Sequence, residues 1–186
     1  MVTKAKPPQP EPPQDPPSFP IVGIGASAGG LEALEAFLGH VPKESGMAFV
    51  IVQHLDPTHE CIMPEILGRS TGMSVAQVKD RTRVLPNRVY IIPPAADLSL
   101  LRGTLHLFEP TTPRGLRLPI DFFFRSLAAD QRDRSIGVIL SGMGSDGTLG
   151  LRAIKEVAGV VLSRTRIPPS STACPEAPST QAWPTS

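Results

Sequence analysis

The chain has 186 residues, a formal net charge of +1 and an apolar fraction of 40%, which suits a single globular domain with a sizeable core. The balanced charge argues against a nucleic-acid-binding or membrane-surface protein. No apolar run approaches the ~18–20 residues of a membrane-spanning helix. The two cysteines, Cys61 and Cys174, cannot build a disulfide framework, and the N-terminus lacks a signal-peptide pattern, so we expect a cytoplasmic protein.

The 22 prolines gather at the two ends of the chain, with eight in residues 1–20 and five in residues 163–186. The end segments carry little that a core would bury, so they cannot offset the conformational entropy lost on folding. We therefore expect a disordered proline-rich linker at 1–18, a folded domain at 19–162 and a disordered tail at 163–186.

The middle of the chain alternates short, continuously apolar strands with amphipathic helices. This alternation predicts an α/β fold, in which a mostly parallel, doubly wound sheet carries helices on both faces. Ligands of such sheets collect beyond the carboxyl ends of the strands, so the loops there are the ones to search. In chain order we expect strands at 20–25, 48–52, 89–92, 136–140 and 160–162, a hairpin at 98–107 turning at Arg102-Gly103, and helices at 29–39, 60–69, 119–130 and 148–157.

The loop after the first strand has the sequence GASAGG at 25–30. Its Gly-x-Ser-x-Gly spacing fits a nucleophile elbow, because small neighbours permit a sharp turn that exposes the hydroxyl of Ser27. The same stretch contains Gly-x-Gly-x-x-Ala at 23–28, which is similar to a dinucleotide-binding loop. That kind of site needs an acidic residue after the next strand, and this chain has Gln53-His54 there. A plain glycine turn is the third interpretation.

The loops after two later strands add a histidine and a carboxylate. His54 follows the second strand, where it is either a general base or a partly buried structural histidine. A zinc set of His54, Asp56 and His59 has loose spacing and no second ligand group downstream, so we predict no metal site. Asp146 lies in the glycine loop SGMGSDGT at 141–148, where its plainest role is that of an N-cap of the helix that follows or of a turn residue.

The three residues gain weight as a set. Ser27, His54 and Asp146 each follow a different predicted strand, at one edge of one sheet. A serine nucleophile needs a base, and the base needs a carboxylate that fixes its tautomer. The chain order Ser, His, Asp differs from the order Ser, Asp, His of ordinary α/β-hydrolases. The sequence therefore predicts a serine hydrolase of another kind.

These loops resemble the signature loops of the catalytic domain of bacterial chemotaxis protein-glutamate methylesterases, the CheB type. The resemblance covers about residues 19–162 and rests on ordered motifs: GASAGG at 25–30, QHL at 53–55, VYIIPP at 89–94, PID at 119–121, GVIL at 137–140 and SGMGSDG at 141–147. It implies a hydrolase of two-component signalling that removes γ-glutamyl methyl esters from chemoreceptors and deamidates receptor glutamines.

The resemblance also implies a role for each residue of the site. Ser27 is the implied nucleophile, His54 the general base and Asp146 the carboxylate that orients it. Backbone N–H groups at Met143 and Ala28 are the implied oxyanion donors. Family members often have threonine after the nucleophile, where this chain has alanine. No metal and no organic cofactor are implied.

The implied partners are the cytoplasmic helices of methylated chemoreceptors, not nucleic acid, and no membrane insertion is expected. Methyltransferase or sensor domains are further candidates, because the arrangement resembles methylesterase–methyltransferase fusion proteins. Arg114, Arg117 and Arg125 are candidate contacts to acidic receptor helices, although a solvated surface is the favoured interpretation of these arginines. The alternative function is a catalytically impaired domain that only docks to its partners.

The resemblance stops after Leu162. Moving the reading frame of the tail back by one nucleotide permits a continuation that is similar to the family. We therefore hypothesise a frameshift, which the DNA at codons 160–186 would test. On that hypothesis the C-terminal element of the fold is missing, apolar surface is exposed, and activity and solubility are reduced relative to a frame-restored chain.

Overall fold

A six-stranded sheet forms the centre of the computed structural model, which describes residues 17–27, 29–53, 62–110, 117–141 and 145–163. The strand order is β3-β5-β2-β1-β8-β9, and every neighbouring pair is parallel. The sheet confirms the predicted fold class. Its strands are β1 (Ile21–Ala26), β2 (Ala48–Gln53), β3 (Ser74–Gln77), β5 (Arg88–Ile91), β8 (Ser135–Ser141) and β9 (Val160–Ser163).

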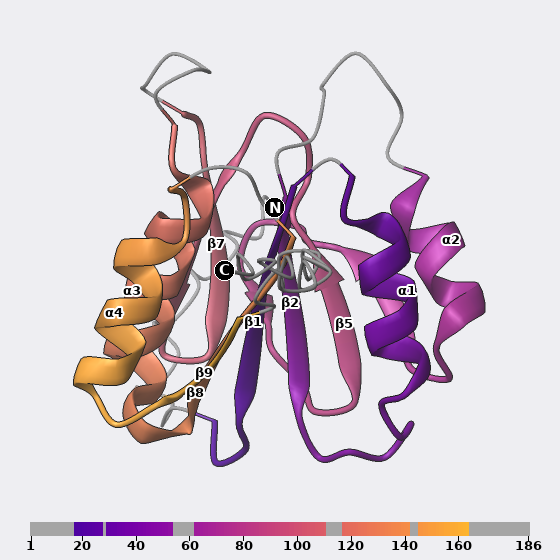
Figure 1. Ribbon diagram of the computed structural model, residues 1–186, viewed down its shortest axis with the longest axis horizontal. Helices are drawn as coiled ribbons and strands as arrows, with labels where there is room; N and C mark the ends of the chain where they lie inside the picture. The colour runs from indigo at the N-terminus through magenta and orange to yellow at the C-terminus, as the bar shows by residue number, and fades with distance from the viewer. Residues whose placement is uncertain (1–16, 28, 54–61, 111–116, 142–144, 164–186) are drawn as a thin grey trace, which may run out of the picture.

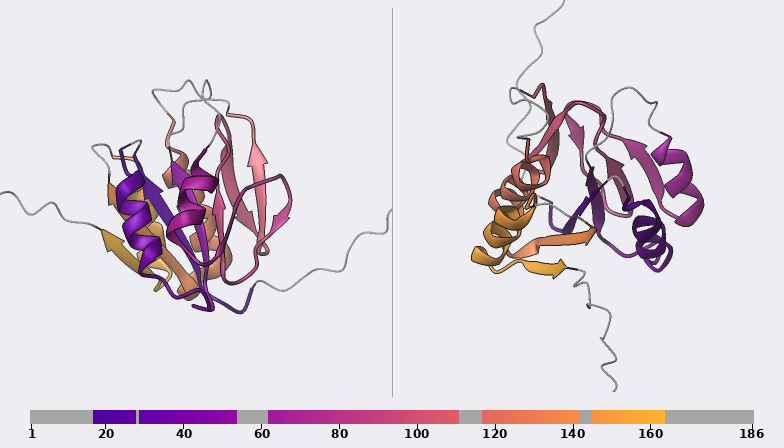
Figure 2. Two further views of the ribbon diagram at one scale, coloured as in Figure 1. Left: turned by 90° about the vertical axis from the view of Figure 1, so that its right-hand side faces the viewer. Right: turned by 45° about the horizontal axis from the view of Figure 1, so that its top comes forward.

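Helices cover both faces of this sheet, as predicted for a doubly wound fold (Figures 1 and 2). Successive residues of a strand point to opposite faces. In β1, Val22 and Ile24 pack in the cluster with Leu34 of the first helix, whereas Ile21 packs in the cluster with Phe123 of the third. The helices are α1 (Leu31–Gly39) and α2 (Met63–Ser70) on one face, and α3 (Pro119–Gln131) and α4 (Thr148–Glu156) on the other.

A second, smaller sheet lies beside α3. It has the order β4-β7-β6 and antiparallel pairing, with β4 at Thr82–Arg83, β6 at Asp97–Leu101 and β7 at Thr104–Phe108. Strands β6 and β7 confirm the predicted hairpin, and Arg102 and Gly103 turn it with φ of 49° and 69°. Strands β3 and β4 were not predicted, because β3 is largely exposed and β4 has two residues, so neither shows an apolar run.

A glycine in β1 lets side chains of helix α3 pack directly against the strand. A Cβ built on Gly23 would lie 2.9 Å from Leu127 Cδ2 and 2.9 Å from Phe124 Cε1, both on α3. The absence of a side chain therefore lets two buried residues of the helix rest on the strand backbone. Helix α3 is thereby fixed against the centre of the sheet, and its N-terminus lies near the sheet's carboxyl edge.

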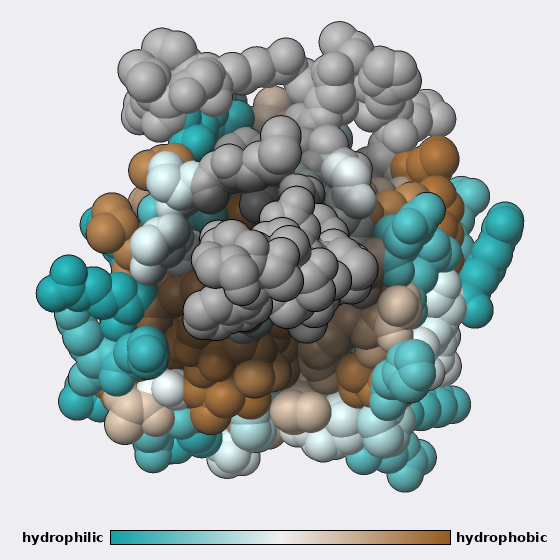
Figure 3. Space-filling view, viewed as in Figure 1, coloured by the Kyte–Doolittle hydropathy of each residue, from teal (hydrophilic) through white to brown (hydrophobic). Residues whose placement is uncertain are grey.

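The sheet ends at β9, which has no further strand beside it among the described residues. Val160 and Leu162 on this strand are 50% and 51% exposed, and hydrophobic surface gathers between α4 and α1 in Figure 3. Strand β9 ends at Ser163, one residue past the predicted domain boundary. Most of the predicted linker at 1–18 and nearly all of the predicted tail lie outside the described residues.

Candidate active site

The three strands that carry the predicted triad are neighbours, and their ends are aligned. Ala26, the last residue of β1, pairs with Gln53 at the end of β2 and with Ser141 at the end of β8. Ser27 follows directly after β1, and chain continuity attaches His54 to the end of β2. The structure describes Ser27 and Asp146 of the predicted site, while His54, Met143 and Ala28 lie outside the described residues.

Ser27 lies in a tight turn between β1 and α1. Its carbonyl oxygen accepts a hydrogen bond from the backbone N–H of Gly30 at 2.8 Å and another from Nε2 of Gln53 at 2.8 Å. Helix α1 begins only four residues later, at Leu31. This strand–turn–helix arrangement is the context that the nucleophile-elbow hypothesis requires, and the side chain of Ser27 is partly buried there.

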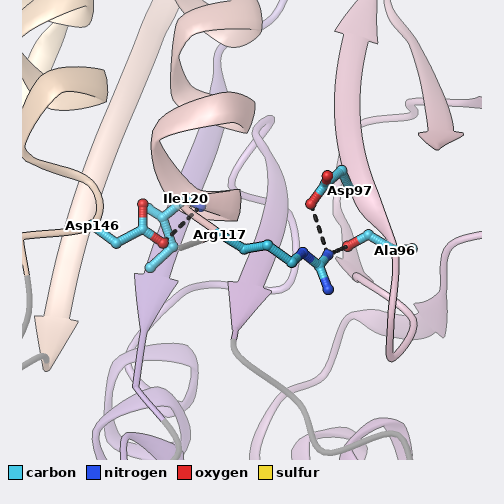
Figure 4. Close-up of polar contacts among 5 residues, drawn as sticks. All are labelled: Ala96, Asp97, Arg117, Ile120 and Asp146. Carbon is cyan, nitrogen blue, oxygen red and sulfur yellow. Dashed lines mark hydrogen bonds and ion pairs between the residues drawn. The ribbon is translucent and has the colours of Figure 1, made fainter. Parts of the chain in front are cut away.

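Asp146 is held by the N-terminus of α3 (Figure 4). Its Oδ2 accepts the backbone N–H of Ile120 at 3.1 Å, and its Oδ1 accepts the N–H of Asp121 at 2.9 Å. First-turn N–H groups have no partner within their own helix, and the helix dipole favours a negative charge there. Of the two plain roles expected for Asp146, that of an N-cap is wrong, because Gly147 is the N-cap of α4 and the carboxylate of Asp146 binds α3. The role of a turn residue is confirmed.

Asp121 binds in the opposite direction, from α3 to α4. Its Oδ1 accepts the backbone N–H of Gly150 at 2.6 Å, and the residue is 4% exposed. A Cβ on Gly150 would lie 2.4 Å from Cβ of Phe124, so glycine is needed for this close approach. The two helices thus exchange carboxylates at their N-termini. In the sequence, Asp121 belongs to the PID motif and was not predicted to have this role, although an aspartate in the first turn of a predicted helix is a usable signal.

Arg117 fixes the segment that enters α3. Its Nη2 donates to the carbonyl oxygen of Ala96 at 2.9 Å and to Oδ1 of Asp97 at 2.8 Å (Figure 4). Its side chain is only 14% exposed. The interpretation of Arg117 as a solvated surface residue is therefore wrong, because its guanidinium binds groups inside the domain. Arg125 is exposed on α3, and Arg114 lies outside the described residues.

Within the described ranges, no group of three or more His, Cys, Asp or Glu side chains is arranged to hold a metal ion. The zinc set considered from the sequence begins at His54 and lies outside those ranges. Gln53, where a dinucleotide site needs an acid, is instead bonded to the Ser27 turn. No helix in the described part of the chain has the length and apolar character to cross a membrane.

Comparison with known proteins supports the same interpretation of the fold. The crystal structure of the Thermotoga maritima CheB methylesterase catalytic domain superposes with a TM-score of 0.69 at 31% sequence identity. The match covers 77% of this chain and 78% of that one.

Sequence relatives agree. Protein-glutamate methylesterase/protein-glutamine glutaminase 1 of Xanthomonas campestris is 36% identical over 135 residues, which are 70% of this chain and 37% of that protein. Protein-glutamate methylesterase/protein-glutamine glutaminase 2 of Burkholderia orbicola is 36% identical over 137 residues, covering 73% of this chain and 41% of that protein. The chain thus spans about two fifths of the length of these relatives. Because residues 22–178 also match the family model described as CheB methylesterase, the chain belongs to the CheB methylesterase family.

Proposed function

We propose that this domain is a protein-glutamate methylesterase, which hydrolyses γ-glutamyl methyl esters on chemoreceptors and deamidates receptor glutamines at the same site. The relatives named above carry both activities in their names. The observation that carries the proposal is the alignment of three adjacent strand ends, at Ala26, Gln53 and Ser141, from which Ser27, His54 and the loop to Asp146 continue.

In the proposed reaction, Oγ of Ser27 attacks the ester carbonyl while His54 takes the hydroxyl proton. The backbone N–H groups of Met143 and Ala28 stabilise the oxyanion of the tetrahedral intermediate. His54 then gives the proton to the departing methanol, and an acyl-enzyme remains. Water, activated by His54, hydrolyses the acyl-enzyme, so that a free glutamate side chain and the Ser27 hydroxyl are restored. In deamidation, ammonia leaves in place of methanol.

The position of Asp146 supports its proposed part in this mechanism. A carboxylate has about four lone-pair sites, so it accepts several hydrogen bonds at once. The bonds from Ile120 and Asp121 fix its plane against α3, and in the proposed mechanism it also accepts the N–H of His54. A carboxylate that is already fixed orients a histidine base better than a mobile one, because less ordering is needed during the reaction.

The proposal includes the partner and the location. The substrate is the cytoplasmic helix of a methylated chemoreceptor, so the domain acts in the cytoplasm, and the exposed Arg125 is the described arginine that suits an acidic receptor surface. Methyltransferase or sensor domains are proposed as further partners. Neither a metal ion nor an organic cofactor takes part.

The decisive assay is methanol release from a methylated receptor fragment. We expect release by the wild-type chain and its loss in Ser27→Ala, with Ser74→Ala as the matched control, since Ser74 is exposed on the distant edge strand β3. A frame-restored chain assayed beside it tests the expected effect of the tail. If neither chain releases methanol, the esterase proposal is wrong.

Labelling with a serine-reactive phosphonate separates the esterase from a domain that only docks. We expect modification of Ser27 that is lost in His54→Ala and kept in His40→Ala, because His40 is an exposed residue at the end of α1. Receptor binding without labelling of Ser27 would favour the docking alternative.

A further inference from the structure

Gln53 is a buried polar residue in an otherwise apolar strand. All six residues of β2, AFVIVQ, are buried, and Gln53 is 6% exposed at its last position. An amide that leaves water without a hydrogen bond costs free energy, so a glutamine at this place needs a compensating contact. Its Nε2 has one, to the carbonyl oxygen of Ser27 at 2.8 Å.

The chemistry of the partner fixes the orientation of this amide. A carbonyl oxygen only accepts hydrogen bonds, so the nitrogen of Gln53, and not its oxygen, must face Ser27. Oε1 is then buried, with no hydrogen-bond partner among the described residues.

The contact holds one particular peptide group. The carbonyl of Ser27 accepts from Gly30 within the turn and from Gln53 across the sheet. The bond from Gly30 lies within the turn, so it does not fix the turn relative to the sheet. The bond from Gln53 joins the turn to β2, the strand from which His54 continues. A peptide group is planar and trans, so fixing the direction of a C=O also fixes the opposite direction of the N–H on the next nitrogen. Here that N–H is the one proposed as an oxyanion donor.

We propose that Gln53 is a positioning residue for catalysis: its amide holds the Ser27 carbonyl so that the following N–H faces the developing oxyanion. The inference rests on the proposed function and adds a residue to it. If this peptide rotated, a carbonyl oxygen would face the negative charge and a donor would be lost. Losing an oxyanion donor outright costs about 10²–10³-fold in kcat. Because the Gly30 bond remains, we expect a loss of about 10–100-fold.

The test uses Gln53→Met and Gln53→Glu in the full chain, with methanol release as the assay. Methionine keeps the length of the side chain but has no donor. An ionised glutamate is only an acceptor, whereas a protonated glutamate has an O–H that donates to the carbonyl. Burial raises the pKa of a carboxyl group, so Gln53→Glu should recover activity relative to wild type as the pH falls, and Gln53→Met should not.

Gln131 provides a matched control. It is 0% exposed, its Nε2 donates to Oδ2 of Asp130 at 2.8 Å, and its Oε1 is likewise buried with no partner in the described part of the chain. It lies at the C-terminal end of α3, the end opposite to the one that holds Asp146. Gln131→Met therefore removes a similar buried amide away from the site.

In Gln53→Met we expect kcat per folded molecule to fall about 10–100-fold, while KM changes little and phosphonate labelling of Ser27 slows in parallel. The control variant Gln131→Met should stay active. Equal kcat for Gln53→Met and Gln131→Met would overturn the inference. So would a Gln53→Glu variant that follows Gln53→Met at every pH. If neither the wild-type chain nor the frame-restored chain releases methanol or labels Ser27, the proposed function is overturned together with the inference. An active parent chain with an equally active Gln53→Met variant overturns the inference alone.

Discussion

The carboxylate of Asp121 should be a major contributor to the stability of the α3–α4 pair. It is 4% exposed and accepts the backbone N–H of Gly150 at 2.6 Å. Asp121→Ala removes the acceptor and leaves the Gly150 N–H without a partner at the start of α4. The backbone N–H of residue 121 is unaffected, so the bonds from α3 to Asp146 have no direct reason to break.

The expected magnitude follows from these contacts. A hydrogen bond to a charged group contributes about 1.5–3 kcal/mol, and a negative charge at a helix N-terminus adds about 0.3–1 kcal/mol. The variant also removes Oδ2, which is buried and has no hydrogen-bond partner among the described residues. Removing this buried oxygen stabilises the fold and so offsets part of the loss. We therefore expect a loss of about 2 kcal/mol, which lowers Tm by about 4–8 °C for a domain of this size.

Thermal and urea unfolding of Asp121→Ala, Asp121→Asn and Asp133→Ala would measure this loss. Asp121→Asn keeps a carbonyl acceptor for Gly150 and should lose less than the alanine variant. Asp133 is exposed in the short helix after α3, so its replacement should change stability by less than about 0.5 kcal/mol. If Asp121→Ala unfolds at the same temperature as Asp133→Ala, the reasoning on exchanged carboxylates is refuted.

Three further predictions concern the rest of the domain. Burial raises the pKa of Tyr90, the chain's only tyrosine, above 10.0 against the opposing hydrogen bond from the Leu85 N–H. The neutral Tyr90 hydroxyl thus contributes its full share to stability below pH 10, and this share is lost as the pH rises through the raised pKa. An ultraviolet titration of the native protein measures this pKa, and a midpoint no higher than that of the unfolded chain would contradict the prediction. Arg117→Met should cost about 1.5–3 kcal/mol in urea unfolding, because it leaves Asp97 without its ion pair. Gly23→Ala should cost about 1–3 kcal/mol in the same measurement, since the new Cβ meets Leu127 at 2.9 Å; an unchanged unfolding midpoint in either variant counts against its explanation.

Local patterns were sufficient to predict most of the large sheet and its helices. The apolar runs that became β1, β2 and β8 are each bounded by glycine, proline or a polar residue. Strands β1 and β2 are buried throughout, and Val138 is buried in β8. Strand β3 escaped prediction for a physical reason. It sits at the edge of the sheet, so most of its residues face solvent and no apolar run marks it.

The proposed site residues were predicted by the same local rule, that functional groups gather after parallel strands. Their supporting contacts were not, because these depend on register and helix packing. Gln53 meets Ser27 only because Ala26 and Gln53 pair across β1 and β2. Asp146 meets α3, which starts 27 residues before it, only because α3 packs against β1 through Gly23. Neither the pairing nor the packing has a signature in the residues nearby.

The exchange of carboxylates between α3 and α4 has a consequence for how the site is kept together. Asp146 is proposed to act in catalysis, yet its two oxygens also satisfy first-turn N–H groups of α3, so its position is set by the same bonds that stabilise the helix. Asp121 joins α3 to α4 by a separate hydrogen bond, to the N–H of Gly150, so the bonds of Asp146 are not the only polar link between α3 and the segment that starts α4. A domain arranged in this way keeps the carboxylate proposed for the triad in place before any substrate binds, because the N–H groups that orient it belong to α3, which packs on the sheet.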